Sequence, residues 1–83
     1  MARKQRPICS HIDDLDPGDI LVWDNTAGTH RCVVTGCRPA LECDAYVIPA
    51  GQTVDAKAVQ TSRQTYHPDC CPHHHGDPRL IVR

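Results

Sequence analysis

The sequence has few large apolar side chains. Its 83 residues include no Phe, one Trp, two Tyr and one Met, and aromatic residues make up 4% of the chain. A chain of this length buries only about 60% of the surface that it exposes when unfolded. The composition therefore excludes a large aromatic core, and the fold needs a further source of stability, such as a metal ion or disulfides.

Long apolar segments are also absent. No stretch approaches the ~20 apolar residues that a membrane span needs, and the basic start breaks at Pro7 without an apolar signal region. We therefore expect a cytoplasmic protein that does not enter a membrane, in the host cytoplasm if the chain is phage-encoded. In a reducing cytosol, clustered cysteines are typical of metal ligands rather than of disulfides.

The chain has no excess of positive charge. Its formal net charge is −1, which excludes a global basic field that would attract nucleic acid. Residues 1–8 are expected to form a flexible basic tip, and residues 1–83 a single small domain. A nucleic-acid contact would have to use local cations, namely Arg3, Lys4, Arg6, Arg31 and Arg38.

Short β-strands are the expected secondary structure. Residues 20–23 form a continuous apolar run that is typical of a strand buried on both faces, and residues 29–35 are rich in β-branched side chains. The turn signal at residues 25–28 predicts that these two segments pair as a hairpin. The fold class is therefore mostly β, with small hairpins and zinc-stapled loops, and a treble-clef-like finger or an SH3-like barrel as alternatives.

Four later segments complete this prediction. Residues 46–48 indicate a brief strand, and residues 52–54 are expected to pair back with it. Residues 56–59 fit either one helical turn capped by Asp55 or a second hairpin that returns over residues 59–66. Residues 79–83 are expected to form an edge strand.

What the sequence has in excess is cysteine and histidine, six of each. A structural zinc ion takes four N or S ligands, usually as two closely spaced pairs. His67 and Cys70 form the strongest pair, and a second pair comes from Cys32, Cys37 and Cys43. The predicted ligands are Cys37, Cys43, His67 and Cys70, with Cys32, Cys71 and His73 in reserve.

A second zinc site is possible at the other end of the sequence. Cys9 and His11 form one close pair, and His30 and Cys32 form another. The alternative for these four residues is a buried small cysteine and exposed histidines, which is common for both residue types. His73, His74 and His75 fit either a labile metal site or a solvated loop.

The segment from Cys37 to Cys71 resembles treble-clef zinc fingers of the LIM and PARP type. In such fingers an aromatic-His-x-x-Cys element closes the site, and Tyr66-His67-Pro68-Asp69-Cys70 matches that element. The first ligand pair is commonly Cys-x-x-Cys in these fingers, whereas Cys37 and Cys43 stand further apart. Small fingers of this kind are familiar from phages and actinobacteria, so the resemblance implies a zinc-binding protein that is phage-encoded (viral) or regulatory.

Catalysis is not expected. A catalytic zinc keeps one coordination position open and needs a neighbouring base. Asp69 and Asp77 flank the ligands, but the sequence has neither a His-Glu-x-x-His motif nor the deaminase signature. The sequence therefore predicts a non-enzymatic zinc-binding module that binds a protein partner. The alternatives are a nucleic-acid-binding finger and an SH3-like adaptor with incidental cysteines.

Overall fold

The structure, a computed structural model, describes residues 2–71 and 77–83, and these residues form nine β-strands and no helix. The strands are β1 (Arg3–Pro7), β2 (Ile12–Leu15), β3 (Ile20–Asp24), β4 (Cys32–Thr35), β5 (Tyr46–Ile48), β6 (Thr53–Lys57), β7 (Ser62–Thr65), β8 (His67–Pro68) and β9 (Arg79–Val82). The prediction of a mostly-β chain is confirmed. Within the described ranges, no apolar helix reaches the length needed to cross a membrane.

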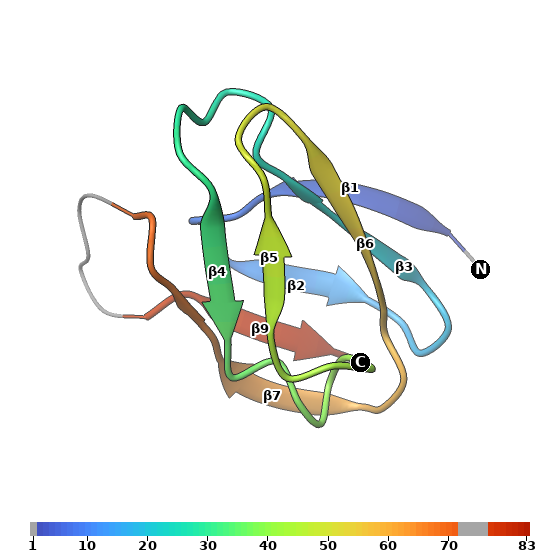
Figure 1. Ribbon diagram of the computed structural model, residues 1–83. Coiled ribbons are helices and arrows are strands. Elements are labelled where there is room, and N and C mark those ends of the chain that lie inside the picture. The colour runs from blue at the N-terminus through green and yellow to red at the C-terminus, as the bar shows by residue number, and fades with distance from the viewer. Residues whose placement is uncertain (1, 72–76) are drawn as a thin grey trace.

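The strands form three small sheets of three strands each. Sheet A has the order β1-β3-β6, sheet B the order β2-β9-β7 and sheet C the order β5-β4-β8. In Figure 1, β4 and β5 of sheet C run across the direction of β2 and β9. Every sheet ends in two edge strands, so the described part of the chain does not close into the SH3-like barrel kept as an alternative above.

Strand β3 is the centre of sheet A, and this corrects the predicted hairpin. β3 pairs in parallel with β1 and antiparallel with β6, whereas β4 pairs with β5 and β8. Both segments of the predicted hairpin are strands, but they belong to different sheets. Because both edges of β3 are already occupied, no edge remains for β4.

The connection between β3 and β4 is held by the side chain of Asn25. Its Nδ2 atom lies 3.0 Å from the carbonyl oxygen of His30 and 3.1 Å from that of Ile48. Asn25 is only 8% exposed, and a buried amide is stable only when hydrogen-bonded. These bonds hold the loop after β3 against residues next to β4 and β5. The loop therefore leads into sheet C and does not make a tight turn back along β3.

The few aromatic residues gather in one core. Trp23 and Tyr66 are fully buried, and their ring centroids lie 5.1 Å apart at an interplanar angle of 55°. Tyr46 lies 6.5 Å from Trp23 on another side. Tilted aromatic pairs of this kind contribute about 0.5–1.5 kcal/mol beyond their buried area. The scarce aromatics are thus concentrated where the sheets meet, instead of being spread along the strands.

The amino-terminal segment is a strand, in place of the predicted flexible basic tip. Its cations are held by carboxylates from other segments. Arg3 lies 2.9 Å from a carboxylate oxygen of Asp55, and Arg6 pairs with Asp14. Together with the parallel pairing of β1 on β3, these contacts order residues that look mobile when the local sequence is considered alone.

Three further predictions need correction. Residues 53–57 form β6, which pairs with β3, so residues 52–54 do not return along β5 and no helical turn follows Asp55. β7 is a strand within residues 59–66, but it pairs with β9 and not with β6. Strand β9 is central in sheet B, because β2 pairs along one of its edges and β7 along the other.

Candidate metal and disulfide centre

Two disulfides lie at one end of the molecule. One joins Cys32 to Cys70, and the other joins Cys9 to Cys71. From the sequence, these cysteines are expected to be metal ligands in place of bridges. The structure differs because two segments that are distant in sequence, those of Cys9 and Cys32, converge on the adjacent cysteines 70 and 71.

The inner disulfide follows from the register of sheet C. Val34 lies opposite Pro68, and Thr35 lies opposite His67. Continuing this antiparallel register by two residues beyond the pair of Val34 and Pro68 places Cys32 opposite Cys70. The Cα atoms of Cys32 and Cys70 are 5.1 Å apart. This separation is within the range that a disulfide bridges without distortion of the backbone.

Asp69 extends this register beyond the two residues of β8. Its carboxylate accepts a hydrogen bond of 2.8 Å from the backbone N–H of Val33, and its own N–H donates to the Val33 carbonyl at 3.0 Å. The two bonds join Asp69, the neighbour of Cys70, to Val33, the neighbour of Cys32. Asp69 thus has a structural role here, and its position sets the approach of Cys70 to Cys32.

The outer disulfide depends on a turn that follows β1. The hydroxyl of the buried residue Tyr66 shares its proton between the carbonyl oxygens of Ile8 and Ser10. Burial raises the pKa of Tyr66, so the phenol remains a hydrogen-bond donor at neutral pH. This anchor holds both neighbours of Cys9 from inside, and Cys9 itself is exposed next to Cys71.

The two disulfides form one cluster that becomes more buried toward Cys32. Cys9 is exposed, Cys70 and Cys71 are half-buried, and Cys32 is fully buried. The bridges span sequence separations of 62 and 38 residues, and loop closure of this length stabilises a fold by about 4 kcal/mol per disulfide. For a chain with a thin core this is a large contribution.

The same cluster contains the groups of side chains that can hold a metal ion. Among the described residues, the ligand atoms of Cys9, Cys70 and Cys71 lie within 4.8 Å of one another, and so do those of Cys32, Asp69 and Cys70. The two groups share Cys70. Four sulfur atoms and one carboxylate therefore converge from the start, the middle and the end of the chain.

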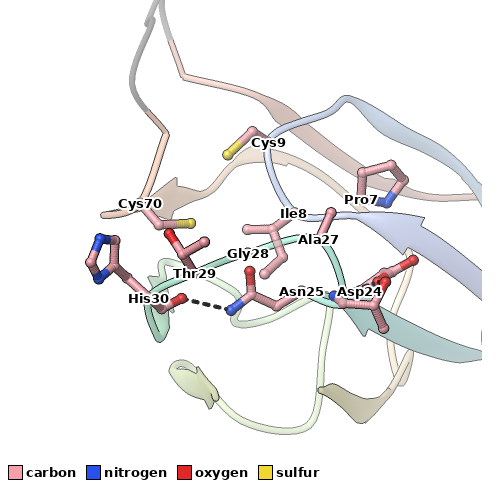
Figure 2. Close-up of a pocket in the computed structure, with 11 residues that line it drawn as sticks. Pro7, Ile8, Cys9, Asp24, Asn25, Ala27, Gly28, Thr29, His30 and Cys70 are labelled. Atoms are coloured by element: carbon pink, nitrogen blue, oxygen red, sulfur yellow. Dashed lines mark hydrogen bonds between the residues drawn. The ribbon is translucent and has the colours of Figure 1, made fainter. Parts of the chain in front are cut away.

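A hollow opens beside the cluster. Figure 2 shows Cys9 and Cys70 on one side of it, with Ile8, Asn25 and Thr29 nearby. The loop from Asp24 to His30 forms the other wall. The lining combines apolar residues such as Ile8 and Ala27 with polar ones such as Thr29 and His30, and the hollow gives solvent a path to Cys9 and Cys70.

Two of the four predicted ligands lie elsewhere. Cys37 and Cys43 have free thiols in the loop between β4 and β5. Burial, with smaller contributions from Asp44 and Cys43, raises the pKa of Cys37 to about 12. A metal ligand must be a thiolate, so the environment of Cys37 favours a neutral core thiol. The loop is closed by a hydrogen bond of 3.0 Å from the Cys37 N–H to the Asp44 carbonyl.

His67, the third predicted ligand, faces a carboxylate. Its Nδ1 atom lies 3.2 Å from an oxygen of Asp77, and its ring packs against Gly36. Neither group of metal-ligating atoms in the described residues contains Cys37, Cys43 or His67. The structure therefore does not bring Cys37, Cys43, His67 and Cys70 together.

The second predicted site is also divided. Cys9 and Cys32 bond to different partners in the carboxy-terminal segment. His11 accepts a hydrogen bond of 3.0 Å from the backbone N–H of Arg79, and His30 lines the hollow. The reserve ligand His73, together with His74 and His75, lies outside the described residues.

All four clustered cysteines are candidate ligands on the sequence, but there they belong to different predicted sites. The signal that groups them is the dipeptide Cys70-Cys71, because adjacent cysteines cannot easily bond to each other and each needs a partner from elsewhere.

No family model, no curated protein and no solved structure matches this chain.

Proposed function

We propose that the protein is a non-enzymatic interaction module that holds one zinc ion when its thiols are reduced, with Cys9, Cys32, Cys70 and Cys71 as ligands. The observation that carries this proposal is the convergence of four sulfur atoms from three separate segments. Four thiolates are a common ligand set of structural zinc sites. The proposal keeps Cys70 from the set predicted on sequence and replaces Cys37, Cys43 and His67.

The geometry of the cluster suits zinc in the reduced chain. A zinc–sulfur bond is about 2.3 Å long, so ligands of one tetrahedral site lie roughly 3.8 Å apart. Cys9, Cys70 and Cys71 already satisfy a limit of 4.8 Å. Of the other three cysteines, only Cys70 belongs to the same group of ligand atoms as Cys32. The side chain of Cys32 would therefore rotate toward the ion once the inner disulfide is open.

A site with four thiolates supports a structural role in preference to catalysis. All four coordination positions are filled, and no position remains for a water molecule or a substrate. The nearest carboxylate, Asp69, is bonded to the backbone of Val33. The zinc would therefore replace the two disulfides as the staple of the thin core.

A protein partner fits the surface better than nucleic acid. Of the five cations suggested for nucleic acid, Arg3, Lys4 and Arg6 all lie within 4.0 Å of a carboxylate oxygen. A phosphate backbone would have to displace these carboxylates. Arg31 and Arg38 are exposed in two different loops, so the five do not supply one unpaired basic face.

Strand β5 offers a surface for such a partner. It is an edge strand of sheet C, and its central residue Val47 is 53% exposed. An exposed strand edge binds an extended peptide through main-chain hydrogen bonds. We therefore propose β5 as the partner site.

Metal analysis tests the zinc site. We expect about one zinc per untagged chain purified under reducing conditions, and unfolding in circular dichroism when a strong chelator is added. Cys71→Ser and Cys9→Ser should lose bound zinc, whereas the matched control Cys43→Ser should keep it. A reduced chain that binds no zinc and melts identically in chelator would instead favour a metal-free β module in which the cysteines are incidental.

A peptide-display selection tests the partner site. We expect the zinc-loaded chain to select extended peptides with alternating apolar residues, and Val47→Lys to abolish their binding, because an edge lysine blocks strand addition. Lys57→Ala serves as a control on β6. Selected peptides that bind Val47→Lys as well as the unmodified chain would place the site elsewhere, and binding of DNA or RNA would overturn the choice of a protein partner.

A further inference from the structure

We propose that the four clustered cysteines form a redox switch, in which the chain exchanges one bound zinc ion for the two disulfides Cys9–Cys71 and Cys32–Cys70. The zinc-bound state of this switch rests on the proposed function. Its oxidised state is the arrangement that the structure contains. In this switch, small-molecule disulfides in solution oxidise the four cysteines and so control whether the site holds zinc.

Both states use the same four sulfur atoms at nearly the same positions. The Cα atoms of the bonded pairs are 5.7 Å and 5.1 Å apart, and the sulfur atom of Cys70 lies within 4.8 Å of those of Cys9 and Cys71. Conversion therefore needs rotations of side chains and no rearrangement of the sheets. The anchors formed by Tyr66 and Asp69 contain no sulfur and stay in place in both states.

The reaction balances with a small organic disulfide as the oxidant. The four zinc-bound thiolates lose four electrons and form two S–S bonds. Two molecules of the small disulfide accept these electrons, their S–S bonds break, and four protons from solvent convert the products into four thiols. Zn²⁺ leaves as a hydrated ion, because a disulfide sulfur is no longer a thiolate ligand.

The gradient of burial sets the order of the steps. A small disulfide reaches Cys9 first, because Cys9 is exposed and borders the hollow (Figure 2), whereas Cys32 is fully buried. The mixed disulfide formed at Cys9 is then displaced by Cys71. The first bridge thus removes two of four zinc ligands, and release of zinc should accompany it. The inner bridge forms second.

The two thiols of the other loop remain outside the switch. Cys37 is fully buried, and its raised pKa keeps it protonated. Cys43 is exposed and would react with the oxidant by itself. A Cys43→Ser background removes this side reaction and leaves the four clustered cysteines and Cys37.

The test follows zinc and disulfides in one titration. Reduced, zinc-loaded Cys43→Ser protein is treated with oxidised glutathione, released zinc is measured with a chromogenic indicator, and the bridges are mapped by peptide mass spectrometry. We expect about one zinc released for every two disulfides formed, the pairing Cys9–Cys71 and Cys32–Cys70, and uptake of zinc again after a dithiol is added. Partly oxidised samples should contain Cys9–Cys71 before Cys32–Cys70.

Two results would overturn the switch. One is bound zinc that stays bound while both disulfides form, and the other is zinc release with different pairings. A reduced chain that never binds zinc defeats the proposed function as well, so the two failures can be told apart at the loading step. As a second variant, Cys9→Ser in the same background should form the Cys32–Cys70 bridge on oxidation and no outer bridge; oxidation of Cys71 to a bridge with Cys32 or Cys70 instead would contradict the proposed pairing.

Discussion

The two regions that carry cysteine use the residue in opposite ways. At the end of the molecule, Cys9, Cys32, Cys70 and Cys71 come from distant segments and bond to one another. In the loop between β4 and β5, Cys37 and Cys43 are six residues apart, yet both are free. Closeness in sequence therefore did not create a site. Convergence in space did, because sheet register and the Tyr66 anchor bring the distant sulfurs together.

This comparison predicts that the four clustered cysteines (Cys9, Cys32, Cys70 and Cys71) stabilise the oxidised fold, whereas Cys43 does not. Cys32→Ser removes the inner bridge and should lower the free energy of unfolding by about 2–5 kcal/mol. Cys43→Ser changes one exposed thiol and should stay within about 0.5 kcal/mol of the unmodified chain. Urea denaturation of the oxidised proteins measures both. Equal losses in the two variants would erase the distinction between the regions.

The junction of the two regions gives the next largest effect. Gly36 ends β4 and has a φ of +74°, and a Cβ atom there would lie 2.9 Å from Cδ2 of His67. Gly51 has the same φ with nothing within 4 Å, so Gly51→Ala should cost only the backbone term of about 1–2 kcal/mol. Gly36→Ala should cost more, because His67 must also move.

Thermal melts of the two alanine variants supply the measurement. The difference between them isolates the contact of Gly36 with His67. If Gly36→Ala is no more destabilising than Gly51→Ala, the histidine moves freely and does not hold the junction.

The buried thiol of the loop should be replaceable. Cys37→Ala removes one buried sulfur atom and should cost about 1 kcal/mol, while zinc uptake by the reduced chain stays at the level of the unmodified protein. Cys37→Ser should cost more, about 1–3 kcal/mol, if its hydroxyl finds no partner in the core. Denaturation and metal analysis of both variants decide the matter. Loss of zinc from Cys37→Ala would return Cys37 to the ligand set predicted on sequence.

Local patterns in the sequence predicted β3, β4 and β5, but they missed β1 and β2 and did not give the partners of the strands. The apolar run at residues 20–23 and the brief strand at residues 46–48 are both found. The pairing of β3 with β1 was missed, because it depends on Arg3 and Arg6 meeting Asp55 and Asp14 from distant segments. Parallel pairing has no short turn that local sequence can reveal.

The candidate site was limited by the same lack of long-range information. Spacing rules favour cysteines that are close in sequence, and they led to Cys37 and Cys43. The partner of Cys32 is set by the register between β4 and β8, and that of Cys9 by the Tyr66 hydroxyl. Neither can be obtained from the spacing of cysteines and histidines.

Acid should affect the sheets near β1 and leave the bridges of the cysteine end intact. A hydrogen bond from Arg6, together with the charges of Arg6 and Lys4, lowers the pKa of Asp14 despite partial burial. Backbone N–H groups of Asp16 and Ala2 lower the pKa of Asp19. Because these folded pKa values lie below the unfolded value of about 3.9, the stabilisation is present above that pH and is lost as the pH falls through the folded pKa values.

Urea denaturation of the oxidised chain between pH 7 and pH 2 should therefore show a loss of stability that begins near pH 4. Asp14→Asn removes the titrating group and Arg6→Gln removes the partner that lowers its pKa, so both should make the loss smaller while reducing stability at neutral pH. The Cys9–Cys71 and Cys32–Cys70 bridges do not titrate and should persist throughout. An acid transition that keeps its full size in both variants would assign it to other carboxylates, and the ion pairs of β1 would then contribute order without pH-dependent stability.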